Sequence, residues 1–362
     1  MEELPKQSAE FLRVRGFLAR NDFEGFTPES LFIMQFVKKG WGQDIAALSN
    51  MAEALLNSLK ADLIEKSEVK ALIDGVVVRA LHKNVSPYRK DPRVVKNLGQ
   101  YGYYLEHLNI ILGCYHSAVD DEYLNLNLRV TEHLLAASSA EKNCHAPLLP
   151  NVRMRWSADQ AAIIYSIWLY DQNNGTSLAD DLRDKWLSYM DTYMRDPKTR
   201  LFMTEVMGVK RYSKQPRGCA LAYLIYYGNH FAPQMAEEQW SLFKKHLLIK
   251  RLGITGFREY LVRYKGRWTP DSGPIVASIG VGASGLALKT AACMADIEIY
   301  NLLNRSASPI MKILRGFMYV PLLNRLARLG TDLLATSIKL NADTRITLIH
   351  RIQGQNCSEA EL

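Results

Sequence analysis

Apolar side chains recur every three or four positions through most of this chain, which is the spacing of one buried helix face. The clearest case is residues 44–63, where Ile45, Leu48, Leu55 and Leu59 share a face. The same spacing predicts helices over 69–81, 102–119, 122–138, 158–171, 177–193, 218–227, 233–249, 280–302 and 311–340. Turn residues separate these stretches, so the chain is a succession of helix pairs.

A helix pair returns about every 40–60 residues, and such a rhythm is typical of an all-α solenoid or closed toroid. Strand-like alternation is nearly absent, although residues 260–268 are expected to form a β-hairpin arm. No low-complexity linker divides the chain. We therefore predict one domain over 1–362, with a polar lead-in over 1–30 and C-terminal helices over 303–362 that close or cover the ring.

Composition and charge narrow the class of protein. Apolar residues make up 48% and charged residues 23% of the 362 residues, as in ordinary globular proteins. The first twenty residues contain no apolar run of a secretory signal, and no segment has the roughly 20 apolar residues of a spanning helix. Five widely spaced cysteines suit a reducing compartment, so we expect a cytoplasmic protein. Whether copies of the chain associate into a homo-oligomer stays open.

The net charge of +8 concentrates toward the C-terminus. No aromatic-basic RNA motif or zinc-finger spacing accompanies it, so nucleic-acid binding is not expected. In residues 310–340, apolar side chains alternate with Arg315, Arg325 and Arg328, as in a helix lying on a membrane surface. The stretch predicts either peripheral contact with the inner face of a membrane or a last helix pair that closes the toroid.

Two familiar motif types give no cofactor or metal site. Residues 280–285 match G-x-G-x-x-G, but no βαβ unit follows, so small residues packing against a neighbouring helix explain them better. Cys114 and His116, like Cys144 and His145, lack a second ligand pair at zinc spacing. We therefore expect neither a metal nor a nucleotide.

Candidate chemistry begins with ionisable groups inside apolar helices, which cost free energy unless they are paired or used. His107 lies among Tyr101, Tyr104 and Glu106, which could set its tautomer, and it is either a satisfied core histidine or a site residue. Asp159 follows Trp156 at the start of an apolar helix. It either caps that helix or acts as an acid or base at the mouth of a cavity.

A second polar group lies further along the chain. Arg217 is either a buried ion-pair partner or a substrate clamp, and Glu259 and Asp271 are the nearby acidic candidates. We expect one of these carboxylates to neutralise Arg217.

Several of these residues stand in short segments that resemble the linalool dehydratase/isomerase family. The segments are Tyr-Leu-Glu-His107-Leu-Asn-Ile, Ser166-Ile-Trp-Leu-Tyr-Asp171, Asp196-Pro-Lys-Thr-Arg-Leu-Phe, Arg258-Glu259 and Asp271-Ser-Gly-Pro, within residues 102–296. The resemblance implies an (α/α)6 barrel and cofactor-independent acid/base chemistry on apolar isoprenoid alcohols. His107 falls on the family's site histidine, and Asp159 replaces the second of its two site cysteines.

The leading hypothesis is an intracellular lyase or isomerase that hydrates, dehydrates or isomerises a small apolar, isoprenoid-like molecule in a central cavity. Asp159 is its general acid/base and His107 the partner, while Tyr101, Tyr104, Trp156, Arg217, Glu259 and Asp271 contact the substrate.

Two alternatives stay open. The first is a carbohydrate-active hydrolase or lyase that pairs Asp159 with Glu259 or Asp271, with Tyr101, Trp156 and Trp268 as sugar-stacking platforms. The second is a non-catalytic binding or scaffold protein at the membrane surface.

Overall fold

The structure, a computed structural model, describes residues 8–20, 41–208, 210–211, 215–251, 253–263, 266, 272–273, 275–317 and 333–359. The helices that line the centre are α2 (Trp41–Lys60), α4 (Gly102–Ala118), α6 (Ser157–Asn174), α8 (Gly218–Phe231), α10 (Val281–Cys293) and α13 (Leu333–Glu359). Around them stand α1 (Ala9–Leu18), α3 (Lys66–Leu81), α5 (Leu124–Ser139), α7 (Ala179–Tyr193), α9 (Pro233–Leu247) and α11 (Ile297–Phe317).

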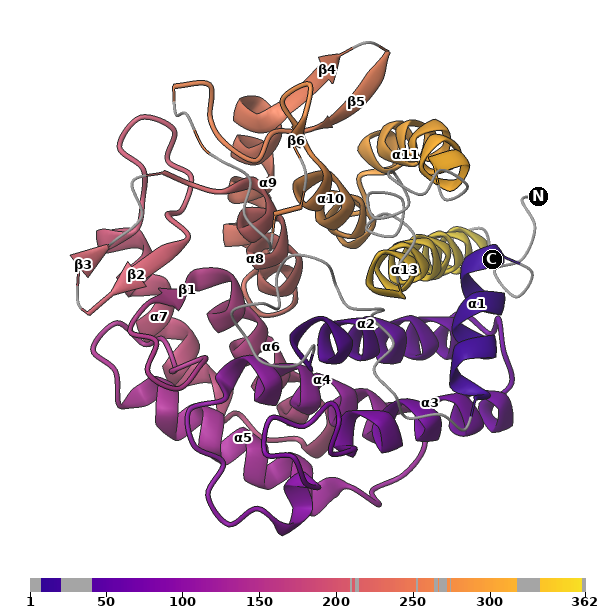
Figure 1. The fold of residues 1–362 in the computed structure, drawn as a ribbon, viewed down its shortest axis with the longest axis vertical. Helices are drawn as coiled ribbons and strands as arrows, with labels where there is room; N and C mark the ends of the chain where they lie inside the picture. The colour runs from indigo at the N-terminus through magenta and orange to yellow at the C-terminus, as the bar shows by residue number, and fades with distance from the viewer. Residues whose placement is uncertain are drawn as a thin grey trace.

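The inner helices form a closed ring. Each packs against the next in the order α2, α4, α6, α8, α10, α13, and α13 packs back against α2 (Figure 1). The outer helices α3, α5, α7, α9 and α11 each pack on the inner helix that precedes them, and α1 packs on α13. The predicted all-α (α/α)6 toroid is therefore confirmed.

Burial explains which helices lie inside. In α4, nearly every residue from Gly102 to Tyr115 is buried, because this helix has neighbours on both sides and an outer helix behind it. In the outer helix α7, Leu182 and Trp186 are buried while the charged side chains face outward. A helix that is apolar all round suits the inside of a ring, and an amphipathic helix suits its outer layer.

The connections between helices differ in length at the two ends of the ring. Those that lead from an outer to an inner helix are long, at 82–101, 140–156, 194–217 and 248–280. Those that lead from an inner to an outer helix are short, at 61–65, 119–123, 175–178, 232 and 294–296. Because the long connections join the N-termini of the inner helices, that end of the ring has the material to build a site.

Short antiparallel strands lie in the long connections. A three-stranded sheet has the order β1 (Arg155–Trp156), β2 (Glu205–Met207), β3 (Lys210–Arg211). Two hairpins are β4 (Leu248–Arg251) with β5 (Ile254–Phe257), and β6 (Ile275–Val276) with β7 (Ile279–Gly280). The minor β-hairpin arms are thus present, but the hairpin expected at 260–268 lies at 248–257 instead. Of the expected range, 264–265 and 267–268 lie outside the described residues.

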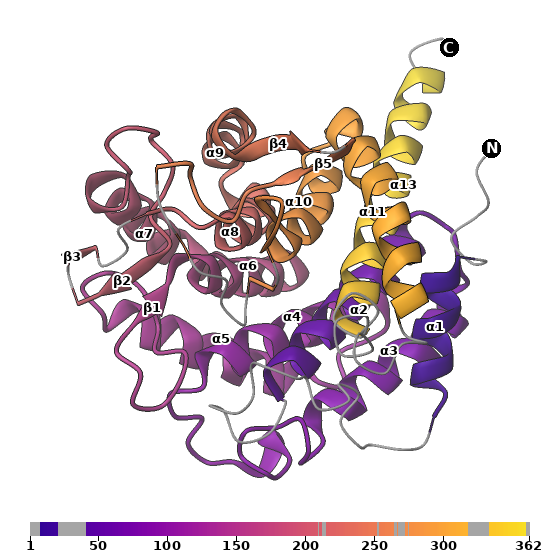
Figure 2. The same cartoon turned by 45° about the horizontal axis from the view of Figure 1, so that its top comes forward.

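The N-terminal lead-in contains a helix that its polar composition concealed. In α1, Phe11, Val14, Phe17 and Leu18 are buried, and Figure 2 shows the helix beside α13 and α3. The apolar stripe is only ten residues long and is interrupted by charged residues, so its periodicity is weak in the sequence. The lead-in predicted over 1–30 therefore includes a short helix that packs against the ring.

The C-terminal third also departs from the expected helices. The single helix expected over 280–302 is two, because the chain turns at 294–296, where Ala295 has a φ of 52°. The helix expected over 311–340 is divided between the end of α11 and the start of α13, and residues 318–332 lie outside the described part. The membrane contact expected for 310–340 falls largely on those residues. Within the described residues, no helix is long and apolar enough to cross a membrane.

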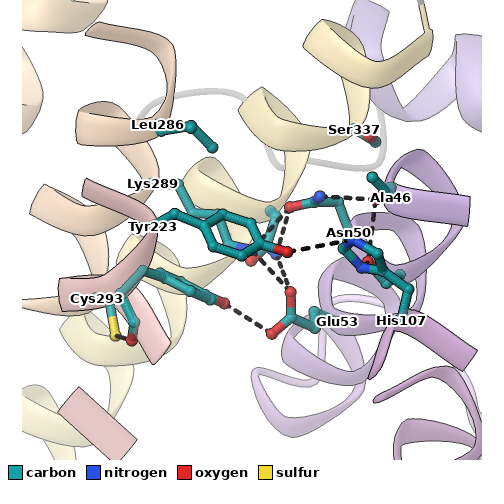
Figure 3. A network of polar contacts seen from close by, with 12 residues as sticks. Ala46, Asn50, Glu53, His107, Tyr223, Leu286, Lys289, Cys293 and Ser337 are labelled. Carbon is teal, nitrogen blue, oxygen red and sulfur yellow. Dashed lines mark hydrogen bonds and ion pairs between the residues drawn. The ribbon is translucent and has the colours of Figure 1, made fainter. Parts of the chain in front are cut away.

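An ion pair is buried at the centre of the ring (Figure 3). The Lys289 Nζ atom of α10 donates to Glu53 Oε2 of α2 at 2.9 Å and to Asn50 Oδ1 at 2.8 Å. Asn341 of α13 donates to the same Glu53 oxygen at 2.9 Å, and Tyr226 of α8 donates to Oε1 at 3.0 Å. The ammonium also lies 3.6 Å from the centre of the Tyr226 ring. Four inner helices therefore share one satisfied network, here called the central cluster.

Removing one member of the central cluster should strongly destabilise the protein. We expect Lys289→Met to lower the free energy of unfolding by about 3–5 kcal/mol, because it leaves the Glu53 carboxylate buried without its cation. Denaturant unfolding measures the loss. The control Lys185→Met removes an exposed ammonium paired with Asp181 and should cost under about 1 kcal/mol. Equal losses for the two variants would contradict a structural role for the central cluster.

Candidate functional site

The N-terminal halves of α4, α6 and α8 bring together polar side chains that are far apart in the sequence. Glu106 and His107 come from α4, Asp159 from the first turn of α6, and Arg217 and Tyr223 from the start and second turn of α8. The N-termini of these helices carry partial positive charge, which favours a carboxylate nearby. This end of the ring is also the end with the long connections.

Two carboxyl groups meet at the centre of this site. Glu106 is fully buried, whereas Asp159 is half-buried. Burial first, and then the negative charge of the nearby Asp159 carboxyl, raise the pKa of Glu106 well above its ordinary value. Within the described residues, neither Glu106 oxygen has a hydrogen-bond partner. Ionisation of Glu106 is therefore costly, and this carboxyl keeps its proton near neutral pH.

His107 follows Glu106 in α4, and both of its ring nitrogens have hydrogen-bond partners, one of which is the Tyr223 hydroxyl seen in Figure 3. The Ser49 Oγ atom lies 2.7 Å from His107 Nδ1 and donates its single hydrogen to the Ala46 carbonyl at 3.0 Å. Nδ1 must then carry the ring proton and donate to Ser49. Nε2 accepts from the Tyr223 hydroxyl at 3.2 Å and lies 3.8 Å from Glu106 Oε1.

The imidazole of His107 is neutral in this setting. Burial, followed by the positive charge of Lys289, lowers its pKa to about 3. It therefore cannot serve as a cationic partner for Asp159 near neutral pH, and the carboxyl nearest to its ring is Glu106, at 3.8 Å. His107 orients Tyr223 and Ser49, which makes it a positioning residue in this arrangement.

Arg217 is engaged by acidic groups rather than pointing unpaired at a substrate. Its Nε atom donates to Glu259 Oε1 at 3.1 Å, and Nη1 lies 3.5 Å from Glu205 Oε1. The second Glu259 oxygen accepts from the Cys219 amide at 3.0 Å, and the Cys219 thiol donates to Oε1 at 3.1 Å. Of the two acidic candidates, Glu259 is the carboxylate that neutralises Arg217.

A glycine makes this close packing at the start of α8 feasible. The Gly218 amide donates to the Glu259 carbonyl at 2.8 Å. A Cβ at this position would collide with the Arg258 carbonyl and the Ala283 side chain. Without a side chain at position 218, the loop that carries Glu259 can lie directly on the helix N-terminus.

The remaining residues that were predicted to contact a substrate lie in several different parts of the ring. Trp156 forms β1 at the start of α6, opposite Glu205 of β2, and is partly buried at the rim. Tyr101 begins α4 and packs edge-on against Tyr88 at 5.1 Å between ring centres. Tyr104 is fully buried, and its hydroxyl donates to the Ala80 carbonyl of α3 at 2.8 Å. It therefore faces the outer layer of helices and is not placed to contact a substrate in the ring. Asp271 and Trp268 lie outside the described residues.

Sequence reasoning noticed Glu106 but did not place it in the site. A carboxylic acid in the second turn of a helix that is otherwise apolar is a signal that could have identified it. Tyr223, Ser49 and Glu205 were missed, because nothing local in the sequence distinguishes them from structural residues. Among the described residues, no three His, Cys, Asp or Glu side chains are grouped so that they could hold a metal ion.

The raised pKa of Glu106 predicts how stability depends on pH. A carboxyl whose folded pKa lies above its unfolded pKa contributes stability below the unfolded value, and that contribution is lost as pH rises toward the folded pKa. Between those values, the wild-type free energy of unfolding should fall by about 1.4 kcal/mol per pH unit relative to Glu106→Gln. Urea unfolding from pH 4 to 8 measures this slope. The exposed control Glu132→Gln should run parallel to wild type. A Glu106→Gln curve that also runs parallel would rule out a raised pKa of Glu106 in the folded protein.

Comparison with known proteins gives the fold a context. No family model matches the chain, and no curated protein matches it. An inactive variant of an alpha-1,6-mannanase of glycoside hydrolase family 76 from Salegentibacter sp., bound to alpha-1,6-mannotetrose, is similar with a TM-score of 0.53 at 12% identity, covering 85% of this chain and 89% of that one. A glycoside hydrolase family 76 mannosidase from Bacteroides thetaiotaomicron gives a TM-score of 0.54 at 14% identity, covering 86% and 88%.

These findings correct the family and the chemistry expected from the sequence. The similar solved structures are family 76 mannanases and a mannosidase, so the resemblance to linalool dehydratase/isomerase was wrong. The lyase or isomerase reaction that was expected on an apolar molecule is wrong as well. At 11–14% identity, the likeness shows an (α/α)6 fold in this chain.

Proposed function

We propose that this protein is a carbohydrate-active enzyme that hydrolyses glycosidic bonds at the N-terminal end of its inner helices. The observation that carries the proposal is the placement of a half-buried Asp159 in the first turn of α6 near the fully buried Glu106, whose raised pKa keeps a proton on it. Glycosidic bonds break when an acid protonates the leaving oxygen, and a carboxyl that stays neutral near pH 7 can do so. The shared fold with mannan-hydrolysing toroids supports the same class of substrate.

The two carboxyls have different positions and therefore different roles. Asp159 is half-buried and so can meet the glycosidic oxygen, whereas the fully buried Glu106 lies deeper and replenishes the proton. The proton passes to the oxygen as its bond to the anomeric carbon breaks. Water then adds its hydroxyl to that carbon, and the remaining water proton returns to the pair. Asp159 is the catalytic residue and Glu106 acts through it.

A second carboxylate is needed on the opposite side of the sugar. Flanking carboxyls in glycosidases stand about 5–5.5 Å apart in retaining enzymes and about 6.5–9.5 Å apart in inverting ones. Glu106 lies deeper than Asp159 and acts through it, so the two count as one acid in this scheme. Our candidate for this second carboxylate, the nucleophile or general base, is Glu205. It is half-buried, pairs with Trp156 across the short sheet and lies 3.5 Å from Arg217. Glu259 is held by Arg217 and the Cys219 amide and is unsuited to this task.

Substitution of the two proposed catalytic carboxylates tests the function directly. We expect Asp159→Asn and Glu205→Gln each to reduce release of reducing sugar by at least about 100-fold, since acid–base catalysis typically supplies about 10²–10⁴-fold. Alpha-1,6-linked manno-oligosaccharides are the first substrates to assay, followed by other neutral glycans. The thermal midpoint of both variants should stay near that of wild type.

The matched control is Asp180→Asn, which changes an exposed carboxylate on α7 and should retain full activity. If Asp159→Asn turned over substrate at the wild-type rate, Asp159 could not be the catalytic acid. Absence of hydrolysis by the wild type across neutral α- and β-linked glycans would refute the proposed class of reaction.

The raised pKa of Glu106 also predicts how catalysis depends on pH. The acid works only while protonated, so kcat/KM should fall on the alkaline side at a higher pH than an isolated carboxyl would give. Glu106→Gln removes the neighbouring ionisable group, so the alkaline limb of its residual activity should move to lower pH. Initial rates across the pH range of stable folding measure the shift. An unmoved limb with reduced kcat would mean that Glu106 is merely structural.

A further inference from the structure

A chain of hydrogen bonds crosses the ring of helices from α2 through α4 to α8. It begins at the Ala46 carbonyl, which accepts from the Ser49 hydroxyl at 3.0 Å. Ser49 Oγ lies 2.7 Å from His107 Nδ1, and His107 Nε2 lies 3.2 Å from the Tyr223 hydroxyl (Figure 3). We call this chain the relay and define it as Ala46, Ser49, His107 and Tyr223.

The buried end of the relay fixes the direction of every hydrogen bond in it. A serine hydroxyl has one hydrogen, and Ser49 donates its hydrogen to the Ala46 carbonyl. Ser49 therefore accepts from His107 Nδ1, which leaves Nε2 of the imidazole as the acceptor for the Tyr223 hydroxyl. Because Tyr223 gives its hydrogen to His107, its oxygen has only lone pairs to offer to a further group. The relay makes Tyr223 an acceptor.

Tyr223 is the member of the relay that a ligand can reach. Ser49 and His107 are buried, whereas Tyr223 is partly exposed. One turn deeper in α8, the fully buried Tyr227 packs edge-on against Tyr223, with 4.7 Å between the centres of the two phenols. Since the deeper side of Tyr223 is covered, its exposed part lies toward the N-terminal end of the inner helices.

A second tyrosine stands beside the relay. Tyr103 precedes His107 by one turn of α4, and the two side chains pack edge-on with 5.0 Å between their centres. His107 reaches Ser49 of α2 and, across the ring of helices, Tyr223 of α8, so this face of α4 points inward. Tyr103 shares that face and is partly exposed. It lies in the first turn of α4, as Asp159 lies in the first turn of the neighbouring α6.

The two tyrosines offer complementary groups to a sugar. A pyranose has an apolar face of C–H groups, which can pack against the partly exposed phenol of Tyr103. It also carries hydroxyls that can donate, and the Tyr223 oxygen accepts. An ether oxygen or an apolar molecule has no hydrogen to give, so an oxygen that only accepts selects a ligand with hydroxyls.

We propose that Tyr103 and Tyr223 form a sugar subsite at the end of the ring that holds Asp159. The Tyr223 oxygen accepts a hydrogen bond from a glycan hydroxyl, and the Tyr103 phenol packs against the apolar face of the sugar. Ser49 and His107 are positioning residues that act through Tyr223. This subsite rests on the proposed hydrolysis of glycans, because it holds the substrate of that same reaction.

Binding without turnover tests the two tyrosines. In the Asp159→Asn background, isothermal titration with alpha-1,6-mannotriose, or with the neutral glycan that the wild type hydrolyses fastest, measures affinity alone. We expect Tyr223→Phe to weaken binding about three- to tenfold, since one neutral hydrogen bond is lost. Tyr103→Leu should cost a similar factor, and Tyr103→Phe, which keeps the aromatic face, should recover most of it. The control Tyr123→Phe changes a partly exposed tyrosine at the opposite end of the ring and should bind like the background.

The relay supplies a second test at a buried residue that a glycan cannot touch. Ser49→Ala removes the acceptor of the Nδ1 hydrogen, so the proton of His107 should move to Nε2 and be donated to Tyr223. Glycan affinity should then fall as in Tyr223→Phe, and Ser49→Thr, which keeps a hydroxyl, should recover it. Combined with Tyr223→Phe, Ser49→Ala should add no further loss. Nitrogen-15 NMR of the imidazole should place the proton on Nδ1 in the wild type and on Nε2 in Ser49→Ala.

The outcomes separate the subsite from the proposed reaction. Glycan binding that both tyrosine variants weaken, without any hydrolysis by the wild type, would support the subsite and refute the reaction. Hydrolysis by the wild type with unchanged affinity in Tyr223→Phe would overturn the subsite alone. A proton on Nε2 in the wild type would overturn it as well, and absence of glycan binding by the wild type would overturn both. Circular dichroism confirms that each variant is folded.

Discussion

The buried ion pair between Glu53 and Lys289 is the interaction on which the rest of the ring depends. A carboxylate and an ammonium removed from water repay their desolvation only when every remaining donor and acceptor is satisfied. Here Asn50, Asn341 and Tyr226 complete the set, and they come from three different inner helices. The helices must therefore be in register around one point, which favours this arrangement over other packings of the same apolar faces. The pair also divides the interior into two ends with different chemistry.

The end of the ring that holds Glu106 and Asp159 is determined by the direction in which the inner helices run. Each inner helix begins there, each long connection lies there, and the partial positive charge of several helix N-termini is directed toward it. Asp159 lies in the first turn of α6 next to that field and is half-buried, whereas the deeper Glu106 is in a place where ionisation is costly. The two carboxyls therefore differ because they lie at different depths. A buried carboxyl that keeps its proton is an arrangement that supplies acid at neutral pH.

Much of the fold could be predicted from the sequence, because inner helices that are apolar on every side leave a strong periodic signal. The short amphipathic stripe of α1 and the turn at Ala295 left none, since both depend on neighbours far along the chain. In the site, the sequence identified Asp159, His107 and Arg217 as polar groups out of place. The sequence did not predict that Glu106, rather than Glu259, would lie near Asp159, because that outcome depends on how α4 and α6 are rotated about their axes. The pairing of Glu259 with Arg217 uses a loop position that periodicity does not describe.

The polar groups beside the carboxyl pair argue for a substrate with many hydroxyls. A carboxylic acid that keeps its proton suits any reaction in which an oxygen leaves, so by itself it does not select between an apolar alcohol and a sugar. The polar groups near it favour a sugar, because Glu205 lies 3.5 Å from Arg217 at the start of α8 and the Tyr223 hydroxyl donates to His107. An apolar molecule offers such groups no hydrogen bond, and burying any of their donors or acceptors without a partner would cost about 1–3 kcal/mol each. A sugar can return those hydrogen bonds, so the same side chains that would penalise an isoprenoid would stabilise a bound glycan.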